Sequence, residues 1–394
     1  MSRLRPSPCG KEQGRLYEKG GRLERRFPNH LPKLLELSII QQGGYNLLAM
    51  RVQELGEFGL IDLLNAMVVG QRAGPNNGAP YSIRLLVDTG DDTAAWQTGP
   101  TTELFTTDTV VEGVHFTRVT TPWRDLGWKS IAANISDIAA MGGLPTYALI
   151  TLGLPADTEM EDIRELYLGM LEISNKYGMA IVGGDVVRSP VVFITVALTG
   201  VHPGRPMLRS SARVGDQVAL TGPVGGSGGG LRLMLEHGQI SDPPLRAVSR
   251  EAAEHLRRCH RRPEPAVAAG RMLADAGVMA AMDVSDGLAD DLSKLCRASG
   301  AAARLHADRV PVPPLLKEAF PEDYLELALK GGEDYLLLFT AAPELMRRLI
   351  SKLPGGAATV GEIIPGEPGR VFIVDSFGVE VEAPIYRGGW DHFG

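Results

Sequence analysis

The pattern of apolar and polar positions predicts alternating helices and strands from about residue 54 onward. Helical spacing first appears at the apolar residues 55, 58, 60, 61, 63 and 64, and longer helices are predicted over residues 125–141 and 160–177. Runs of β-branched and apolar residues predict strands at residues 83–87, 103–107, 147–152, 180–182, 191–201 and 217–221. Such an alternation is typical of an α/β protein.

A stretch rich in Pro, Gly and Arg at residues 202–213 interrupts this alternation. It predicts a joint between two α/β domains, which we expect over residues 50–205 and 206–394. A chain of 394 residues is long enough for two domains of ordinary size, each with its own buried core.

The first 49 residues differ from the remainder in composition. They contain nine Lys or Arg and four Glu, which is a local charge of +5. They have no apolar segment followed by a cleavage site, and they have too many glutamates and too few serines for an organelle transit peptide. We expect either a poorly ordered extension upstream of a natural start at Met50, or an ordinary basic tail.

Charge and composition argue against several broad classes of protein. The net charge is −7, so the chain after residue 49 has a charge of −12, which disfavours a general nucleic-acid-binding protein. The longest apolar runs, such as residues 191–198, are far shorter than the ~18 residues of a membrane span. Cys9, Cys259 and Cys296 form no disulfide or metal pattern, so we expect a cytoplasmic protein without membrane contact.

Aspartates recur where apolar segments end in short turns rich in Gly, Ser or Thr. The six cases are LLVDTGDD (residues 85–92), LFTTD (104–108), NISD (134–137), IVGGD (181–185), MDVSDG (282–287) and KGGED (330–334). One such Asp is usually a turn or helix cap, but six with few neighbouring Lys or Arg predict converging carboxylates. Hard oxygen ligands favour Mg²⁺ beside substrate phosphates, so the pattern predicts a magnesium–nucleotide site.

Common signatures of other phosphate-binding enzymes do not occur. The sequence has neither G-x-x-x-x-G-K-[ST] nor G-x-G-x-x-G, and it has no protein-kinase signature. The Gly-rich residues 222–230 follow an apolar strand and open a helix. We expect a tight turn there, with contact to a phosphate group as the alternative.

Eight motifs carry a resemblance to a known family. In order, they are GDDTAA, TTDTVVEGVHF, WKSIAANISDIAAMGGLP, GGDVVR, RSSARVGD, VSDGLADDL, GGEDYLLLF and GGWDHF. They closely resemble the motifs of thiamine-monophosphate kinases, in the superfamily of aminoimidazole ribonucleotide synthetase and selenophosphate synthetase. The resemblance covers residues 56–393, and eight motifs in the family's order make it specific.

The resemblance implies an α/β (α+β) fold with the two domains of the aminoimidazole ribonucleotide synthetase type. The N-terminal sheet would form a barrel across a homodimer, the C-terminal α/β domain would lie beside it, and ATP would bind between the domains. The implied reaction transfers the γ-phosphoryl group of ATP to thiamine monophosphate, with several Mg²⁺ ions, and yields thiamine diphosphate and ADP.

The resemblance also implies a set of site residues. The positions that match the family's metal ligands are Asp92, Thr106, Thr107, Asp108, Asp137, Asp185, Asp283 and Asp286. Those that match its ATP contacts are Gly184, Arg209, Ser285 and Tyr167, although Tyr167 is equally well explained as a core aromatic on a helix. Those that match its substrate contacts are His115, Glu333 and Trp390. Trp390 could stack on a ring of thiamine, and Glu333 could face either its positive charge or its aminopyrimidine.

These residues include no dedicated nucleophile, so we expect direct in-line transfer without a phosphoenzyme and without a general base. Three alternatives follow from the same motifs. Selenophosphate synthetase would require a Cys or selenocysteine in a Gly-rich N-terminal segment, and aminoimidazole ribonucleotide synthetase lacks the GGWDHF and DTVVEGVHF motifs. A non-catalytic sensor of nucleotide or thiamine phosphate would be expected to have lost metal-site aspartates, and all of them are present.

Overall fold

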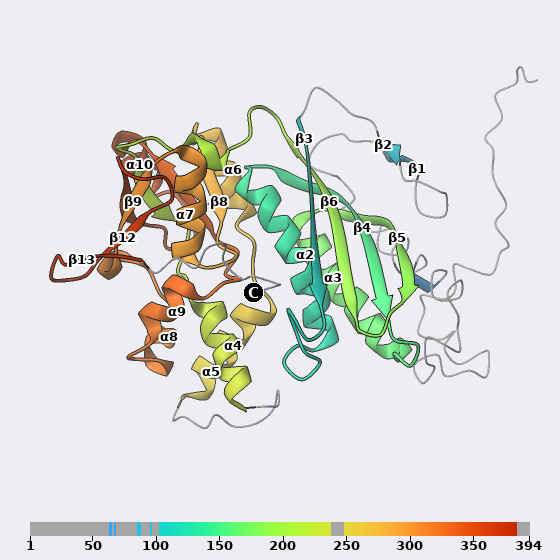
Figure 1. Cartoon of the computed structure of the whole chain (residues 1–394). Coiled ribbons are helices and arrows are strands. Elements are labelled where there is room, and N and C mark those ends of the chain that lie inside the picture. The colour runs from blue at the N-terminus through green and yellow to red at the C-terminus, as the bar shows by residue number, and fades with distance from the viewer. Residues whose placement is uncertain are drawn as a thin grey trace, which may run out of the picture.

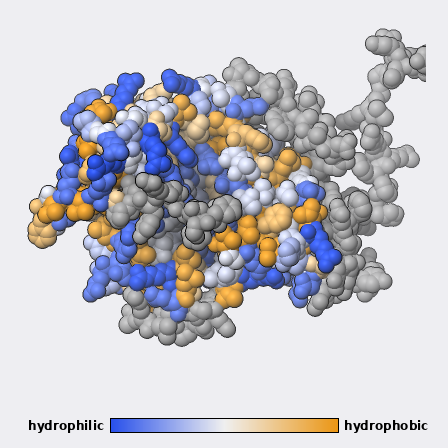
Figure 2. Space-filling model, viewed as in Figure 1, coloured by the Kyte–Doolittle hydropathy of each residue, from blue (hydrophilic) through white to orange (hydrophobic). Residues whose placement is uncertain are grey.

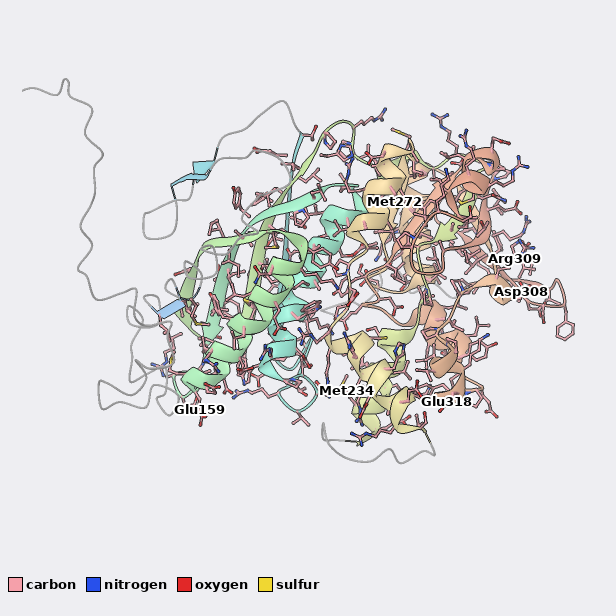
Figure 3. The ribbon with its side chains drawn as sticks, turned by 180° about the vertical axis from the view of Figure 1, so that it is seen from behind. Glu159, Met234, Met272, Asp308, Arg309 and Glu318 are labelled. Atoms are coloured by element: carbon pink, nitrogen blue, oxygen red, sulfur yellow. The ribbon has the colours of Figure 1, made fainter. Side chains whose placement is uncertain are left out.

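The computed structural model describes residues 102–237 and 248–383, together with Leu63, Leu64, Met67 and the antiparallel pair β1 (Leu85–Val87) and β2 (Ala95–Trp96). In this part of the chain a four-stranded sheet and a seven-stranded sheet lie on either side of a long helix, α2 (Trp123–Ala140) (Figure 1). From behind, Glu159 near the four-stranded sheet and Arg309 in the C-terminal half lie on opposite flanks (Figure 3).

The four-stranded sheet has the order β3-β6-β4-β5. Its strands are β3 (Thr102–Val111), β6 (Phe193–His202), β4 (Leu144–Leu154) and β5 (Ala180–Arg188). β4 and β5 run parallel, and the other neighbours are antiparallel. Side chains alternate across β6, where Ile194, Val196 and Leu198 are fully buried, so one face of this sheet forms a core beneath α2 and α3 (Met160–Tyr177).

The seven-stranded sheet has the order β13-β12-β9-β11-β7-β10-β8. Its strands are β7 (Gln217–Leu220), β8 (Ala280–Asp283), β9 (Ala302–His306), β10 (Leu337–Ala341), β11 (Ala358–Ile364), β12 (Val371–Val374) and β13 (Glu380–Glu382). The helices of this half are α4 (Gly226–His237), α5 (Arg250–Arg261), α6 (Val267–Asp275), α7 (Leu288–Ser299), α8 (Pro314–Ala319), α9 (Tyr324–Lys330) and α10 (Pro343–Leu349). No described helix has the length and hydrophobicity needed to cross a membrane.

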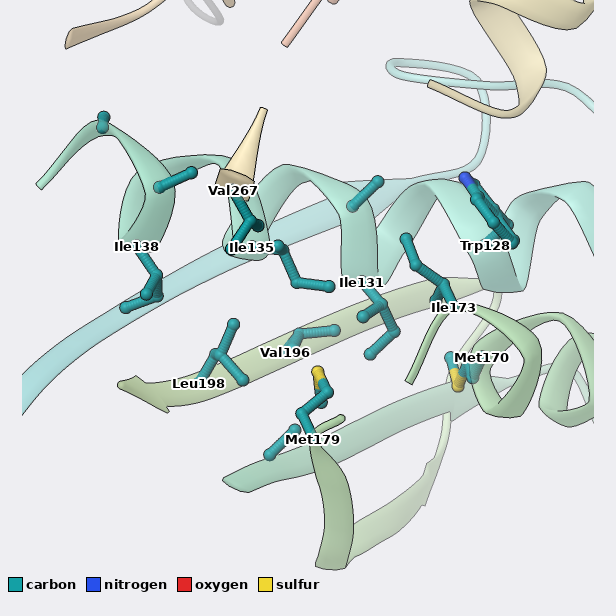
Figure 4. Packing of buried hydrophobic residues seen from close by; sticks show 14 of the residues in the cluster. Trp128, Ile131, Ile135, Ile138, Met170, Ile173, Met179, Val196, Leu198 and Val267 are labelled. Carbon is teal, nitrogen blue, oxygen red and sulfur yellow. The ribbon is translucent and has the colours of Figure 1, made fainter. Parts of the chain in front are cut away.

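Helix α2 is buried on nearly every side, which is unusual for a helix of a globular domain. Ile131, Ile135 and Ile138 contact the sheet and α3 (Figure 4). The same hydrophobic cluster includes Leu337 and Phe339 of β10, so the two halves of the molecule share one continuous core. Polar side chains of α2 are therefore held at fixed positions between the two sheets.

Two glycines allow α2 and α3 to lie in direct backbone contact. A Cβ atom at Gly127 would lie 1.9 Å from the carbonyl oxygen of Leu166, and one at Gly169 would lie 1.8 Å from that of Arg124. Any side chain at either position would force the helices apart, because the obstructing atoms belong to the backbone.

The sequence predicted α3 with the bounds that the structure shows, and Leu63 and Leu64 are helical as expected. The expectation that all the acidic motifs end an element in a turn is wrong for three of them. Asp108 lies inside β3, Asp137 inside α2, and Asp185 inside β5. The two glycines before Asp185 do not turn the chain: a Cβ atom at Gly184 would lie 1.8 Å from the Ile150 carbonyl oxygen, so glycine permits close pairing of β5 with β4.

Candidate active site

Carboxylates from both halves of the molecule meet at the C-terminal end of α2. Asp137 projects from α2 and interacts with Asp108 of β3. From the other half, Asp283 ends β8 and Asp286 lies in the turn before α7. The charge of Asp137 acts on Asp283, and that of Asp286 acts on Asp108. The structure thus brings together four of the predicted metal ligands.

Two hydroxyl groups fix the orientation of these carboxylates. Thr106 Oγ1 donates a hydrogen bond of 2.6 Å to Asp137 Oδ2, and Ser136 Oγ donates one of 2.8 Å to Asp283 Oδ2. Thr106 and Asp108 are two residues apart on β3 and share the face of the sheet that α2 covers. Thr107 points to the opposite, exposed face, away from this cluster.

The cluster holds more negative charge than nearby basic groups balance. Burial, together with the charges of Asp137 and Asp286, raises the pKa of Asp108 to about 6. Burial, together with Asp137 and Asp291, raises the pKa of Asp283 to about 8. The pKa of Asp137 is also raised by burial, although the positive charge of Arg209 opposes this. These carboxyl groups require either protons or cations to coexist.

The donor set of the cluster fits Mg²⁺. It consists of four carboxylates and the Thr106 hydroxyl group, which are hard oxygen donors, and mutual repulsion of the carboxylates favours a cation between them. In the arrangement shown, no three carboxylate, imidazole or thiolate groups of the described residues already form a cage around one ion. Mg²⁺ commonly keeps several water ligands and binds through one or two carboxylates and substrate phosphates, so a complete protein cage is not required.

The turn that carries Ser285 and Asp286 is fixed by a carboxylate that the sequence analysis did not single out. Asp291 is fully buried, and its Oδ2 accepts hydrogen bonds from the backbone N–H groups of Ser285, Asp286 and Gly287 at 2.9, 3.0 and 3.2 Å. Lys294, one turn further along α7, forms ion pairs with both Asp291 and Asp286. The expectation that the acidic motifs have few basic partners is therefore wrong for Asp286.

A second group of polar residues surrounds Glu333, near the N-terminal half of α2. Lys129 Nζ lies 2.7 Å from Glu333 Oε2 and 3.0 Å from His260 Nε2. His115, in the loop after β3, also interacts electrostatically with Glu333, so two of the predicted substrate contacts lie near each other. Glu333 has a φ of 63°, a left-handed conformation that is uncommon outside glycine and concentrates at functional sites.

Sequence reasoning missed Lys129 and His260. Lys129 lies within the WKSIAANISD motif, whereas His260 lies in a polar helix without any distinguishing pattern. Their partners are distant in the sequence: 204 residues separate Lys129 from Glu333, and 131 separate it from His260. Only the fold brings them together.

The Gly-rich residues 222–230 form the predicted turn, since β7 ends at Leu220 and α4 begins at Gly226. The Asp334 carboxylate accepts hydrogen bonds from the backbone N–H groups of Gly225 (2.6 Å) and Ser227 (3.0 Å). Asp334 therefore caps α4 and occupies donors that a phosphate group would otherwise use.

The remaining predicted residues are more dispersed. Arg209, in a short 3-10 turn, is exposed and acts electrostatically on Asp137 and Asp283. Tyr167 lies in the hydrophobic core between α3 and α2, as its alternative explanation expected. Gly184 and Asp185 lie on β5, at the edge of the sheet opposite the edge formed by β3. Asp92 and Trp390 lie outside the described residues.

Two family models match the chain. Residues 90–202 match the N-terminal domain of AIR synthase related proteins, and residues 213–374 match the C-terminal domain. Thiamine-monophosphate kinase from Aquifex aeolicus is 34% identical over 348 residues, which are 87% of this chain and all of that relative. The enzyme of the same name from Bacillus subtilis is 37% identical over 66% of this chain and 78% of that relative.

Solved structures agree with these sequence matches. Thiamine-monophosphate kinase from Stenotrophomonas maltophilia has a TM-score of 0.68 at 32% identity and covers 78% of this chain and 94% of its own. AaThiL complexed with AMPPCP and TMP has a TM-score of 0.66 at 34% identity, and the match covers 88% of this chain and 99% of the AaThiL chain. The hydrogenase maturation protein HypE, at 19% identity and a TM-score of 0.65, shares the fold. The two-domain fold predicted from the motifs is confirmed, and the chain belongs to the thiamine-monophosphate kinase family.

Proposed function

We propose that this protein transfers the γ-phosphoryl group of ATP to the phosphate group of thiamine monophosphate, which yields thiamine diphosphate and ADP. The observation that carries the proposal is the meeting of Asp108, Asp137, Asp283 and Asp286 between the two halves of a thiamine-monophosphate kinase family member. The related AaThiL was solved with AMPPCP and TMP, which correspond to an ATP analogue and the acceptor.

The proposed transfer is a direct in-line displacement. An oxygen of the acceptor phosphate bonds to the γ-phosphorus of ATP while the bond from that phosphorus to the bridging oxygen breaks, and ADP leaves with that oxygen. The acceptor oxygen is already ionised near pH 7, so no residue must remove a proton. The protein has to align two anions and reduce the repulsion between them.

The residues of the cluster have separate roles in this alignment. Asp108, Asp137, Asp283 and Asp286 would hold Mg²⁺, which would neutralise negative charge on the phosphate groups. Thr106 and Ser136 orient two of the carboxylates through their hydrogen bonds. Arg209, exposed beside the cluster, is suited to bind phosphate oxygens with its planar guanidinium group.

We extend the proposal to a homodimer built on the open face of the four-stranded sheet. The face opposite α2 carries the exposed Phe105 and Leu149, and hydrophobic side chains are visible over the strands of this sheet (Figure 2). Exposed apolar faces of this kind commonly mark protein–protein interfaces. Phe105→Glu should shift the protein from dimer to monomer in analytical ultracentrifugation, and a wild-type monomer at micromolar concentration would refute the dimer without affecting the proposed reaction.

The reaction is tested by phosphorus NMR and chromatography of the purified protein with ATP, Mg²⁺ and thiamine monophosphate. Omission of each component and replacement of the acceptor by free thiamine serve as controls. Equal amounts of thiamine diphosphate and ADP, dependent on Mg²⁺ and absent with free thiamine, would support the kinase. If folded protein binds the ligands but forms no diphosphate, it is a sensor rather than an enzyme.

A further inference from the structure

A buried lysine connects the two halves of the molecule at Glu333. The side chain of Lys129 is 3% exposed, although lysine is rarely buried unless it is paired. Lys129 belongs to α2, whereas its two partners belong to the C-terminal half: Glu333 to the loop before β10, and His260 to the last turn of α5. An ammonium group at this position therefore holds a loop of one half against a rigid helix of the other.

The hydrogen-bond chemistry of this group determines the protonation of His260. An ammonium group has donors only, so His260 Nε2, 3.0 Å from Lys129 Nζ, must present its lone pair. The ring proton then lies on Nδ1, which is 3.0 Å from Ser227 Oγ and 3.4 Å from Glu333 Oε2. Burial and the charge of Lys129 lower the pKa of His260 to about 3, in agreement with a neutral ring. Lys129 thus has one neutral acceptor and one anionic partner.

The same contacts control the charge and position of Glu333. Burial alone would raise the pKa of this carboxyl group, but the charge of Lys129 and the hydrogen bond from Lys129 bring the pKa below its usual value. The backbone N–H of Glu333 donates to the Ser285 carbonyl oxygen at 2.8 Å, which ties it to the turn that carries Asp286. The contacts of Lys129 and His260 both fall on Oε2, and the Glu333 side chain is 26% exposed, so the carboxylate remains open to a ligand.

We propose that Lys129 and His260 are positioning residues that hold the Glu333 carboxylate ionised and oriented toward the thiamine moiety of the acceptor. This inference rests on the proposed function. Lys129 does not contact the substrate in this scheme and acts through Glu333. Its loss leaves a half-buried carboxylate without its cationic partner, which takes up a proton or moves toward water. The acceptor then binds more weakly, while the ATP site at the other end of α2 is unaffected.

The test compares steady-state kinetics of the full chain as wild type, Lys129→Met, Glu333→Gln and the double variant. We expect Lys129→Met to raise the KM for thiamine monophosphate about tenfold and to change the KM for ATP by less than about twofold. Because Lys129 acts through Glu333, the double variant should be no more than about threefold worse than Glu333→Gln alone. The matched control is Lys176→Met, which removes an exposed lysine paired with Glu264 across the same two halves of the chain and should leave both KM values unchanged.

A folded Lys129→Met enzyme with an unchanged KM for thiamine monophosphate would overturn the inference, as would additive effects in the double variant.

If Lys129→Met does not fold, His260 provides the second test. His260→Gln keeps an acceptor for Lys129 and should stay within about twofold of wild type, whereas His260→Leu should raise the KM for the acceptor about fivefold. An equal change of the KM for the acceptor in the two His260 variants would also refute the proposed positioning role. Calorimetry measures the Kd for thiamine monophosphate in the wild type and in each variant without turnover. The inference about Lys129 can therefore be tested even if the wild type does not catalyse the proposed reaction.

Discussion

The pKa values of the carboxyl groups near the two ends of α2 are shifted in opposite directions. At the C-terminal end, Asp108 and Asp283 lie near other carboxylates and their pKa values are raised by burial and like charge. Toward the N-terminal end, Glu333 lies against Lys129 and its pKa is lowered despite burial. One largely buried helix borders both groups, so their difference comes from the partners that each half of the chain supplies.

This difference separates two kinds of site. Unbalanced negative charge is destabilising in the ligand-free protein and creates an affinity for cations, as expected of a site for Mg²⁺ and phosphate groups. A carboxylate whose charge is already balanced keeps its hydrogen-bonding capacity and a fixed direction, as expected of a site that recognises an organic group. The comparison predicts that variants at one end change phosphoryl transfer and that variants at the other change acceptor affinity.

The largest effect is expected from the aspartates of the cluster. Asp137→Asn or Asp286→Asn removes one negative charge and keeps the shape of the side chain, so turnover should fall by at least about a thousandfold while the fold is retained. Turnover at saturating Mg²⁺ and circular dichroism of the same samples measure the two quantities. A near-normal rate in either variant would remove that residue from the metal site.

A smaller loss is expected from Thr106→Val. The substitution keeps the volume and β-branching of the side chain but removes the hydroxyl group that donates to Asp137 Oδ2 at 2.6 Å. Turnover should fall about tenfold, and the KM for thiamine monophosphate should stay within about twofold, because Glu333 is not disturbed. The matched control is Thr107→Val on the exposed face of the same strand. Equal losses in both variants would show that strand stability, rather than orientation of Asp137, is responsible.

The two ends of α2 also predict opposite effects of pH on stability. The folded-state pKa values of Asp108 and Asp283, about 6 and about 8, lie well above the usual range of an aspartate, so the folded metal-free protein binds more protons than the unfolded chain from about pH 4 to about pH 8. Their contribution to the free energy of unfolding therefore falls as pH rises from about 4 to about 8. The lowered pKa of Glu333 gives a contribution that is lost only on acidification below its usual range.

Thermal unfolding with a chelator present measures the first of these effects. Asp283→Asn should raise the Tm at pH 8 by roughly 5 °C relative to wild type and should reduce the fall between pH 6 and 8. Saturating Mg²⁺ should raise the wild-type Tm more at pH 8 than at pH 6, because the ion competes with protons. A Tm of the metal-free wild type that rises steadily over this range, unaffected by Asp283→Asn, would contradict the assignment.

The sequence predicted elements best where local signals agree. The amphipathic pattern of residues 160–177 is followed by Gly178, which ends α3 in the left-handed conformation with a φ of 70°. The prediction for β5 covered residues 180–182, whereas the strand extends to Arg188. Gly183 and Gly184 resemble a turn in the sequence, but Gly184 is needed for close contact with β4, which depends on tertiary structure.

The candidate site shows the same limit. Motif spacing identified the acidic residues, and the structure brings Asp108, Asp137, Asp283 and Asp286 together. Motif spacing could not identify the groups that balance the charge of these carboxylates or orient them, such as Lys129 for Glu333. A buried ion pair across two domains leaves no periodic pattern in the chain. The roles of Tyr167 and Asp185 in ATP and metal binding, and the domain limits at residues 50 and 205, stay predictions.

The smallest effect is expected from the N-terminal residues. A chain shortened to begin at Met50 keeps every motif from GDDTAA onward, and it removes nine basic and four acidic residues that no proposed step uses. Turnover and both KM values should stay within about twofold of the full chain. A selective rise in the KM for either substrate would show that residues 1–49 contribute to one end of α2 after all.

The measurement that tests the difference between the two ends most directly is the binding of Mn²⁺, a spectroscopic substitute for Mg²⁺, to protein saturated with AMPPCP. Electron paramagnetic resonance of free Mn²⁺ would compare wild type, Asp286→Asn and Lys129→Met. Asp286→Asn should weaken binding at least about tenfold, and Lys129→Met should leave it within about twofold of wild type. Equal Mn²⁺ affinity in wild type and Asp286→Asn would show that the carboxylates at the C-terminal end of α2 do not form the metal site.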